Sequence, residues 1–290
     1  MADRLFLGVD GGGTASRARL TDADGRVLGE GRSGPSNLNM GIGPAAEAIL
    51  AAARQALAAA GLSDARLGDV VGGFGLAGAN VSALACGLLR VPFPFASFAL
   101  TSDAVIACLG AHGGEDGAIL ILGTGSQGLA MIGGEISTVG GWGFELSDDG
   151  SGAVLGLAAI RAAVLAFDGL APASGLTEAV LARFGGDPSA AAIWGKTAPP
   201  TDFGSFTPLV LDHFAKGDPV AARLLAVSTA SVAGMLERLI ALGAERIALM
   251  GGLAHVYPPL LPPGLRRALV EPRGDALDGA LAFARRSAAA

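Results

Sequence analysis

The stretch Leu5-Phe6-Leu7-Gly8-Val9-Asp10-Gly11-Gly12-Gly13-Thr14 is an apolar run that ends in a carboxylate and a tight glycine loop. The residues after it predict a second strand over 16–21, an Asp-Gly turn over 22–25 and a third strand over 26–31. Alternating apolar and polar residues around such a turn are typical of an antiparallel hairpin. The chain therefore opens on a three-stranded meander with a glycine loop between its first two strands.

The same pattern returns later in the chain. An apolar strand over 118–122 enters a second loop at 123–126, and two further strands are expected over 128–132 and 135–139. Strand, loop, strand, turn, strand thus occurs twice, which predicts an α/β fold with a duplicated architecture of two lobes. Other strands are expected over 70–76, 98–102 and 246–250, and helices over 44–60, 152–167, 218–242 and 276–286.

The pattern breaks near residues 111–116, so we expect an N-terminal lobe of residues 1–112 and a C-terminal lobe of residues 113–290. The last helix can pack back on the N-terminal lobe. A length of 290 residues is natural for two packed lobes.

Composition excludes several classes of function. The formal net charge is -6 and no basic run occurs, so no nucleic-acid partner is expected. Cys86 and Cys108 have no C-x-x-C spacing, which argues against a disulfide framework, a zinc site or a cluster. Asp3 and Asp10 interrupt any apolar signal segment. The uncharged stretch 70–89 is rich in glycine and is interpreted as strand, loop and buried helix instead of a membrane span. A cytoplasmic protein without a membrane partner is expected.

The two glycine loops predict a clamp for a polyphosphate. Glycine lets the backbone approach closely, its amides can point inward, and a Thr or Ser hydroxyl adds a donor. Asp10 stands at the strand end beside the first loop, where a carboxylate can hold Mg²⁺ directly or through water. An ordinary hairpin turn is the alternative for each loop alone. The candidate phosphate-binding residues are Gly11, Gly12, Gly13 and Thr14 in the first loop and Gly123, Thr124, Gly125 and Ser126 in the second.

A second carboxylate, Asp103, follows the apolar strand 98–102. At a strand end it can accept a proton from a sugar hydroxyl while that oxygen attacks the γ-phosphate. The alternative is a helix N-cap for residues 104–110. The segment 140–152 combines Trp142, three carboxylates and many glycines. The indole offers an apolar platform for a sugar and the carboxylates can accept bonds from its hydroxyls, although a turn before a capped helix explains the same pattern.

Two shorter motifs point elsewhere and are rejected. Residues 123–128 satisfy G-x-G-x-x-G, but a dinucleotide site requires a helix next, and residues 129–134 predict a strand and a turn. Residues 190–197 match a relaxed Walker A pattern, but Pro199 and Pro200 follow it. Proline cannot supply the amides of a phosphate-binding helix start.

Taken in order, these segments resemble the BadF/BadG/BcrA/BcrD ATPase family, which includes N-acetylglucosamine kinase and glucosamine kinase. Residues 8–14 are similar to its first phosphate motif and residues 122–126 to its second. The remaining matches, which continue to residue 254, are the catalytic-base segment 100–104, the sugar-site signature 140–151, the adenosine motif 250–254 and Ser36-Asn37, where the kinases place a sugar-contacting Asn.

The resemblance implies two ribonuclease-H-like lobes of the actin/hexokinase-like superfamily, with ATP and sugar in the cleft between them, and lobe closure that excludes water. It implies Asp103 as the base, Asp10 near Mg²⁺, and Gly251 and Gly252 against adenosine. It implies a sugar site of Asn37, Asp103, Trp142, Gly143 and Asp148. Relatives are often dimers, so a homodimer is expected.

The function expected is phosphorylation of N-acetylglucosamine or glucosamine by ATP, at the 6-hydroxyl. The family signature usually reads Gly-Asp-Glu-Gly-Ser, whereas this chain has Ser147-Asp148-Asp149-Gly150-Ser151, so Ser147 and Asp149 bear on substrate choice. Two alternatives stay open: a sugar-sensing ATP-binding protein without useful turnover, and an ATPase coupled to a partner protein. The family branch that ligates an iron–sulfur cluster is disfavoured, because Cys86 and Cys108 do not suit such a site.

Overall fold

The structure is a computed structural model, and residues 4–289 are described. Its contacts divide the chain into two compact units. Unit 1 comprises the residues up to Gly117 together with those from Glu271 onward, and unit 2 comprises Ala118–Val270. Each unit is described by itself.

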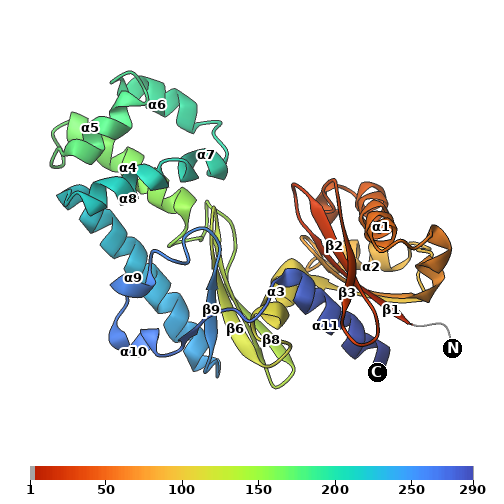
Figure 1. Cartoon of the computed structure of the whole chain (residues 1–290). Coiled ribbons are helices and arrows are strands. Elements are labelled where there is room, and N and C mark those ends of the chain that lie inside the picture. The colour runs from red at the N-terminus through yellow and green to blue at the C-terminus, as the bar shows by residue number, and fades with distance from the viewer. Residues whose placement is uncertain (1–3, 290) are drawn as a thin grey trace. The chain divides into compact units, whose positions relative to one another are not determined.

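Unit 1 is built on a five-stranded mixed sheet with helices on both faces (Figure 1). Its elements are β1 (Leu5–Gly11), β2 (Ser16–Thr21), β3 (Val27–Ser33), the short helix η1 (Leu38–Met40), α1 (Ile42–Ala59), η2 (Asp64–Asp69), β4 (Val70–Leu76), α2 (Ser82–Leu89), β5 (Ser97–Ser102), α3 (Asp103–Ala111) and α11 (Ala276–Ala289).

The strand order in unit 1 is β3-β2-β1-β4-β5. β2 runs antiparallel to β1 and β3, whereas β4 runs parallel to β1 and β5. The carboxyl ends of β1, β4 and β5 therefore lie at one edge of the sheet. This edge carries the ends of the strands that lead into the glycine loop and into Asp103, as expected for ligand sites in open α/β sheets.

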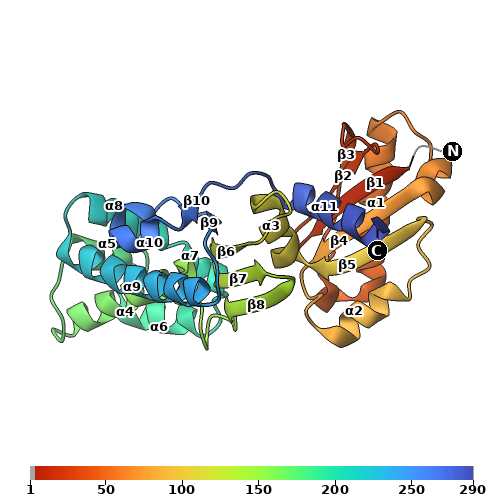
Figure 2. The same ribbon diagram turned by 90° about the horizontal axis from the view of Figure 1, so that it is seen from below.

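Glycines in the strands let helices lie directly on both faces of this sheet. A side chain at Gly31 would place its Cβ 2.1 Å from the carbonyl oxygen of Ala52 in α1. On the other face, a Cβ at Gly73 would lie 2.3 Å from the carbonyl oxygen of Ala280 in α11. α11 also packs against α3, and the two helices lie side by side in both ribbon views (Figures 1 and 2).

Unit 2 contains the second five-stranded sheet and most of the helices. Its elements are β6 (Gly117–Leu122), β7 (Ser126–Ile132), β8 (Glu135–Gly140), α4 (Gly152–Phe167), α5 (Gly175–Ala182), α6 (Pro188–Gly195), α7 (Pro200–Gly204), α8 (Thr207–Ala215), α9 (Pro219–Ala241), β9 (Ile247–Met250), η3 (Pro258–Leu260), α10 (Pro263–Arg266) and β10 (Leu269–Val270).

The strand order in unit 2 is β10-β9-β6-β7-β8. Read from the other edge, this order repeats that of unit 1: the strand before the glycine loop is central, its hairpin lies on one side and two parallel strands lie on the other. The predicted duplication is confirmed. A core of aliphatic side chains joins the sheet to α4 and α9, and an aromatic cluster of Phe184, Trp194 and Phe206 lies among the smaller helices.

The structure confirms the reasons for rejecting the dinucleotide and Walker A motifs. Residues after the second glycine loop form β7, so no helix follows the G-x-G-x-x-G pattern. The Walker-like residues lie at the end of α6, where Lys196 is the C-cap. Segment 70–89 is β4, a turn and α2, as predicted, but α2 buries only Leu88 because it lies at the surface of unit 1.

Helix α9 begins as predicted, since Asp218 caps it by accepting the amides of Val220 and Ala221. Among residues 4–289 it is the one helix long and apolar enough to cross a bilayer, by length and composition only. One of its faces packs in the core of unit 2 through Leu225, Val232 and neighbouring side chains.

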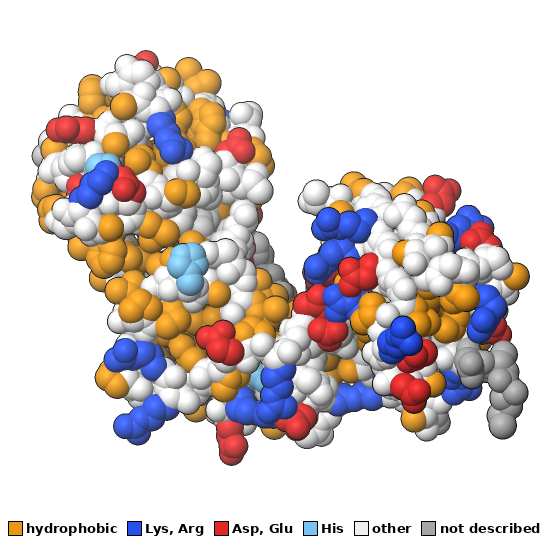
Figure 3. Space-filling view, viewed as in Figure 1, with side chains coloured by type: hydrophobic (Ala, Val, Ile, Leu, Met, Phe, Trp, Pro, Cys, Tyr) orange, Lys and Arg blue, Asp and Glu red, His pale blue; other side chains and the backbone are white. Residues whose placement is uncertain are grey.

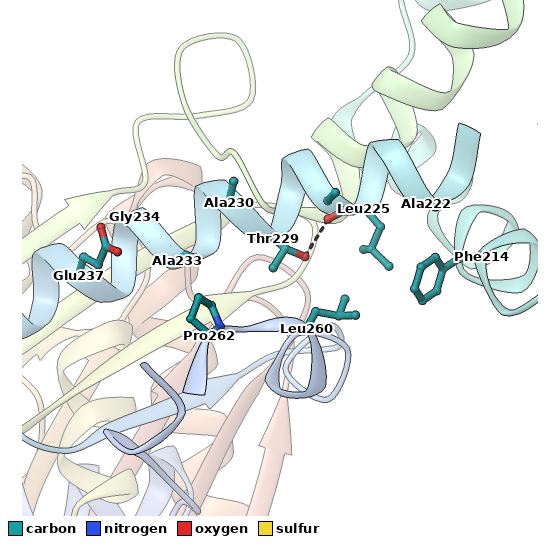
Figure 4. A pocket seen from close by; sticks show the side chains of 11 residues that line it. Phe214, Ala222, Leu225, Thr229, Ala230, Ala233, Gly234, Glu237, Leu260 and Pro262 are labelled. Atoms are coloured by element: carbon teal, nitrogen blue, oxygen red, sulfur yellow. Dashed lines mark hydrogen bonds between the residues drawn. The ribbon is translucent and has the colours of Figure 1, made fainter. Parts of the chain in front are cut away.

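The opposite face of α9 is apolar over its middle and charged towards its ends. Ala226, Ala230 and Gly234 are exposed on it, and Val227 is 65% exposed. Hydrophobic side chains gather over this helix in the space-filling view (Figure 3). A hollow of about 520 Å³ runs along it, bounded by Phe214 at one end and by Leu260 and Pro262 alongside (Figure 4).

Candidate active site

The first glycine loop of unit 1 is tied to the segment that carries Asn37. The carbonyl of Gly12 accepts the amides of Ser36 and Asn37, at 3.1 and 3.2 Å. A side chain at Gly11 would collide with the Ser36 hydroxyl, since its Cβ would lie 1.9 Å from that oxygen. Glycine is therefore required at Gly11, and the loop and Asn37 are held as one substructure.

Asn37 presents one half of its amide to the chain and the other towards the loop. Its Oδ1 accepts the backbone amide of Asn39 at 2.9 Å and caps η1. Its Nδ2 lies 3.8 Å from the position of a Cβ on Gly13. The N–H donors of the Asn37 side chain thus face the loop predicted to bind phosphate. This orientation suits a side chain that contacts substrate next to that loop.

Asp10 is paired with an arginine that the sequence analysis missed. Arg17 lies directly across the hairpin from Asp10, and its Nη2 is 2.6 Å from Asp10 Oδ2. The register of the predicted hairpin is the signal that could have found it. No group of three or more His, Cys, Asp or Glu suited to a metal occurs among the described residues. A single carboxylate still suits Mg²⁺, which keeps several waters and takes phosphate oxygens as ligands.

Asp103 is the first residue of α3. Ser102, and not Asp103, is the N-cap, because its Oγ accepts the amide of Val105 at 3.3 Å. The pKa of Asp103 is raised chiefly by desolvation and further by the negative charge of Asp10, against the lowering effect of the Ala104 amide. A carboxylate with a raised pKa is a stronger base near neutral pH. Because Ser102 is the cap, the Asp103 carboxylate is not needed to cap α3 and is available for another task.

The second glycine loop is tied to the start of α4 in unit 2. The carbonyls of Gly123 and Thr124 accept the amides of Gly152 and Ala153, at 2.8 and 3.2 Å. Ser126 is buried, and its hydroxyl donates to the carbonyl of Asp149 at 2.8 Å. The structure therefore gives Ser126 a backbone partner in the segment predicted to bind sugar.

Asp148 and Trp142 are held together by Ser147. The Ser147 hydroxyl accepts the Trp142 amide at 3.0 Å and donates to Asp148 Oδ1 at 3.1 Å. Asp148 has a φ of 63°, a left-handed conformation that Asp tolerates better than most residues. Its Oδ2 lies 2.6 Å from the position of a Cβ on Gly125. The departure from the family signature at Ser147 thus has a structural role.

Trp142 is 73% exposed, so its indole is open to a ligand. The turn beneath it is closed by the Gly143 carbonyl, which accepts the amide of Ser147 at 2.8 Å. Gly143 has a φ of 99°, which a side chain would strain. An exposed indole beside an oriented carboxylate can stack on the apolar face of a sugar and accept bonds from its hydroxyls.

A cavity of about 620 Å³ in unit 2 joins the second glycine loop to the predicted adenosine motif. Gly123, Thr124 and Gly252 line it. Gly251 precedes Gly252 and packs against the backbone of Leu122. Only glycine fits there, because its φ is 91° and a Cβ would lie 2.4 Å from the Leu122 carbonyl oxygen. The lining residues that the sequence analysis missed come from α7, α8, the link between them and the turn after β9, and they are Thr201, Gly204, Ser205, Thr207, Pro208, Leu211 and His255.

The fold and these loops define a class, the two-lobed ATPases of the actin/hexokinase-like fold. The profile of the BadF/BadG/BcrA/BcrD ATPase family matches residues 7–262. The chain therefore belongs to this family, as the sequence motifs predicted.

Its relatives include sugar kinases. The chain is 42% identical over 279 residues to the glucosamine kinase GspK of Vibrio cholerae serotype O1, covering 96% of this chain and 95% of that protein. The crystal structure of a candidate N-acetylglucosamine kinase from Chromobacterium violaceum is 38% identical, with a TM-score of 0.86 and coverage of 98% and 100%. A glucokinase of Streptomyces griseus in complex with glucose and AMPPNP shares the fold alone, at 20% identity, a TM-score of 0.53 and coverage of 97% and 98%.

Proposed function

We infer that this protein is an ATP-dependent amino-sugar kinase, a phosphotransferase that acts on a hydroxyl group. The likeness to a glucosamine kinase over nearly the full length of both chains carries this conclusion. The glycine loops and the nucleotide-sized cavity suit the binding of ATP, and the Asp103 carboxylate suits proton transfer from a hydroxyl group. Glucosamine and N-acetylglucosamine are the two candidate substrates, with the 6-hydroxyl as acceptor.

In unit 1, Asp103 accepts the proton of the sugar hydroxyl as its oxygen attacks the γ-phosphate. Its raised pKa favours that transfer, and its place at the start of α3 holds the carboxylate at the sheet edge. The amide of Asn37 orients the sugar beside the Gly11–Thr14 loop, whose backbone amides bind phosphate. When bound, Mg²⁺ neutralises phosphate charge, and Asp10 would hold it directly or through water.

In unit 2, the Gly123–Ser126 loop and the 620 Å³ cavity bind ATP, with Gly251 and Gly252 against the adenosine. Trp142, Gly143 and Asp148 bind the sugar. Ser147 fixes the direction of Asp148, so that carboxylate is oriented before substrate arrives. Catalysis then comes from positioning and from charge stabilisation in the transition state.

Two alternatives make different predictions. A sugar-sensing protein would bind both ligands without turnover, and a partner-coupled ATPase would hydrolyse ATP without sugar. The exposed Trp142 beside Asp148 argues against the coupled ATPase, because neither residue has a task in sugar-independent hydrolysis. The Asp103 carboxylate argues against the sensor, because a protein without turnover needs no base.

The test is ADP release from ATP and Mg²⁺ with glucosamine, N-acetylglucosamine, N-acetylmannosamine, glucose or no sugar. We expect turnover with an amino sugar, and a loss of about 10²–10⁴-fold in Asp103→Asn. Asp24→Asn, in an exposed turn of the same unit, is the control that keeps full activity. Equal ADP release in every well would support the coupled ATPase, and binding without release would support the sensor.

The proposal includes a cytoplasmic homodimer that pairs through the exposed face of α9. In an antiparallel pairing centred on Ala230, Arg223 of one copy faces Glu237 of the other, because the two residues lie equally far from Ala230 along the helix. Ala226 then meets the small residue Gly234 of the other copy. The small side chains allow close packing, and the terminal charges are complementary.

A further inference from the structure

The only tyrosine of the sequence, Tyr257, is fully buried in unit 2. Its hydroxyl donates to the carbonyl of Gly150 at 2.5 Å and lies 2.8 Å from Ser228 Oγ of α9. Because the phenolic proton goes to Gly150, Ser228 is the donor to the tyrosine oxygen. A buried hydroxyl with both functions satisfied holds its partners in a fixed geometry.

Gly150 belongs to the segment that carries Asp148. It has a φ of 84°, and a Cβ on it would lie 2.6 Å from Val232 Cγ2, so its backbone rests directly on α9. The next residue, Ser151, donates its amide to the carbonyl of Asp148 at 3.0 Å. The Tyr257 bond therefore acts on the backbone that sets the left-handed conformation of Asp148.

In the sequence, Tyr257 directly follows the turn after β9. Leu253 and His255 of this turn line the nucleotide cavity. The turn is internally bonded, from the Ala254 amide to the Gly251 carbonyl and from the Val256 amide to the Leu253 carbonyl. Because the turn is internally bonded, any displacement of the cavity-lining residues would also displace Tyr257.

We propose that Tyr257 is a positioning residue that couples occupancy of the nucleotide cavity to the geometry of the Asp148 segment. The assignments of nucleotide to the cavity and of sugar to the Asp148 segment rest on the proposed function, whereas the contacts that join the two segments through Tyr257 do not. A tyrosine that only fills the core would stabilise unit 2 without making residues 140–151 respond to nucleotide. The two roles are separable, because Tyr257→Phe keeps the ring and removes the hydroxyl.

The first test is amide hydrogen exchange of the full chain with and without ADP. We expect ADP to slow exchange in residues 140–151 of the natural protein, and Tyr257→Phe to reduce that response by about fivefold, the effect of one buried hydrogen bond. Thr229→Val is the matched control, since it also removes a buried hydroxyl of α9, one that bonds only to the Leu225 carbonyl of its own helix. It should keep the response.

The second test uses the phosphorylation assay. Tyr257→Phe should raise KM for the amino sugar by about fivefold while kcat changes by less than about twofold, and Thr229→Val should change neither. If the natural protein phosphorylates no sugar, the proposed function fails while the exchange result still decides the role of Tyr257. An ADP response that is absent from the natural protein, unchanged in Tyr257→Phe, or lost equally in Thr229→Val overturns the proposal.

Discussion

Asp103 shows how one side chain acquires its chemistry from its surroundings. Desolvation raises its pKa, and the neighbouring negative charge of Asp10 adds to the rise. Arg17, paired with Asp10, offsets part of that charge. Since Asp103 must be unprotonated to act as a base, activity should fall as the pH drops through this raised pKa, at a higher pH than for an ordinary carboxylate.

The contribution of Asp10 can be measured directly. Asp10→Asn removes the negative charge near Asp103 and leaves the Arg17 guanidinium unpaired, and both effects should lower the pKa of Asp103. Carbon NMR titration of the Asp103 carboxyl in the protein without ligands checks this. Asp24→Asn should leave the titration unchanged, and an equal shift in both variants would contradict the assigned cause.

Two glycines of one loop predict two different defects. A Cβ on Gly125 would lie 2.6 Å from the Asp148 carboxylate, whereas a Cβ on Gly123 meets no protein atom within 4 Å and enters the nucleotide cavity. Gly125→Ala should therefore raise KM mainly for the sugar, and Gly123→Ala mainly for ATP, each by about tenfold. Steady-state kinetics with each substrate varied in turn measures the contrast, and identical profiles would refute it.

At the scale of elements, the packing of α11 on α3 depends on two glycines. A Cβ on Gly279 would approach the Ile106 carbonyl oxygen to 1.8 Å, and one on Gly110 would approach that of Asp275 to 1.9 Å. Backbone lies against backbone here, so no side chain can move aside. The C-terminal helix is thereby fixed to unit 1.

Gly279→Ala should destabilise the protein by about 1–3 kcal/mol, because the two helices must move apart. Gly43→Ala in the first turn of α1 is the control, since its Cβ meets nothing within 4 Å. It should be neutral or stabilising by about 0.5–1 kcal/mol. Urea unfolding monitored by circular dichroism measures both, and equal stability of the two variants would disprove the close crossing.

The same helix is held by a charge network that should weaken in acid. Arg19 is within 3.0 Å of Asp275 and 2.6 Å of Asp278. Burial acts to raise the pKa of Asp275, but hydrogen bonds from the Asp278 amide and Arg19 outweigh it and the pKa is lowered. A depressed pKa means that this contribution is present above the unfolded-state pKa and is lost as the pH falls through the folded-state value.

We expect Arg19→Met to lower stability at pH 7 by roughly 0.5–1 kcal/mol, since the acidic partners are partly exposed. The difference from the natural protein should shrink as the pH falls below about 4. Thermal unfolding across this range measures it. A difference that stays constant with pH would assign the effect to lost packing of the arginine stem.

At the scale of the whole molecule, the exposed face of α9 predicts the oligomeric state. Ala230→Arg places a charge at the centre of the proposed pairing and should convert a dimer to a monomer in sedimentation velocity. Glu178→Arg, at an exposed position of α5, should leave the mass unchanged. If the natural protein sediments as a monomer, the proposed homodimer is wrong.

Much of the molecule could be predicted because its signals are local. Short runs of sequence are sufficient to predict the meander, the glycine loops, the cap of α9 by Asp218 and the family. What could not be predicted depends on register or on distant contacts. Arg17 reaches Asp10 only through the hairpin, and the lining of the nucleotide cavity by α7 and α8 has no local motif. Both require knowledge of which segments meet.

The sequence by itself determined the class of fold and the family, because periodicity and glycine placement act on the backbone nearby. The tertiary structure alone decided that Ser102 and not Asp103 caps α3, that Ser147 orients Asp148, and that Tyr257 joins the turn after β9 to Gly150. A hydrogen bond between residues far apart along the chain forms only when packing brings them within about 3 Å, and no short sequence pattern encodes that distance.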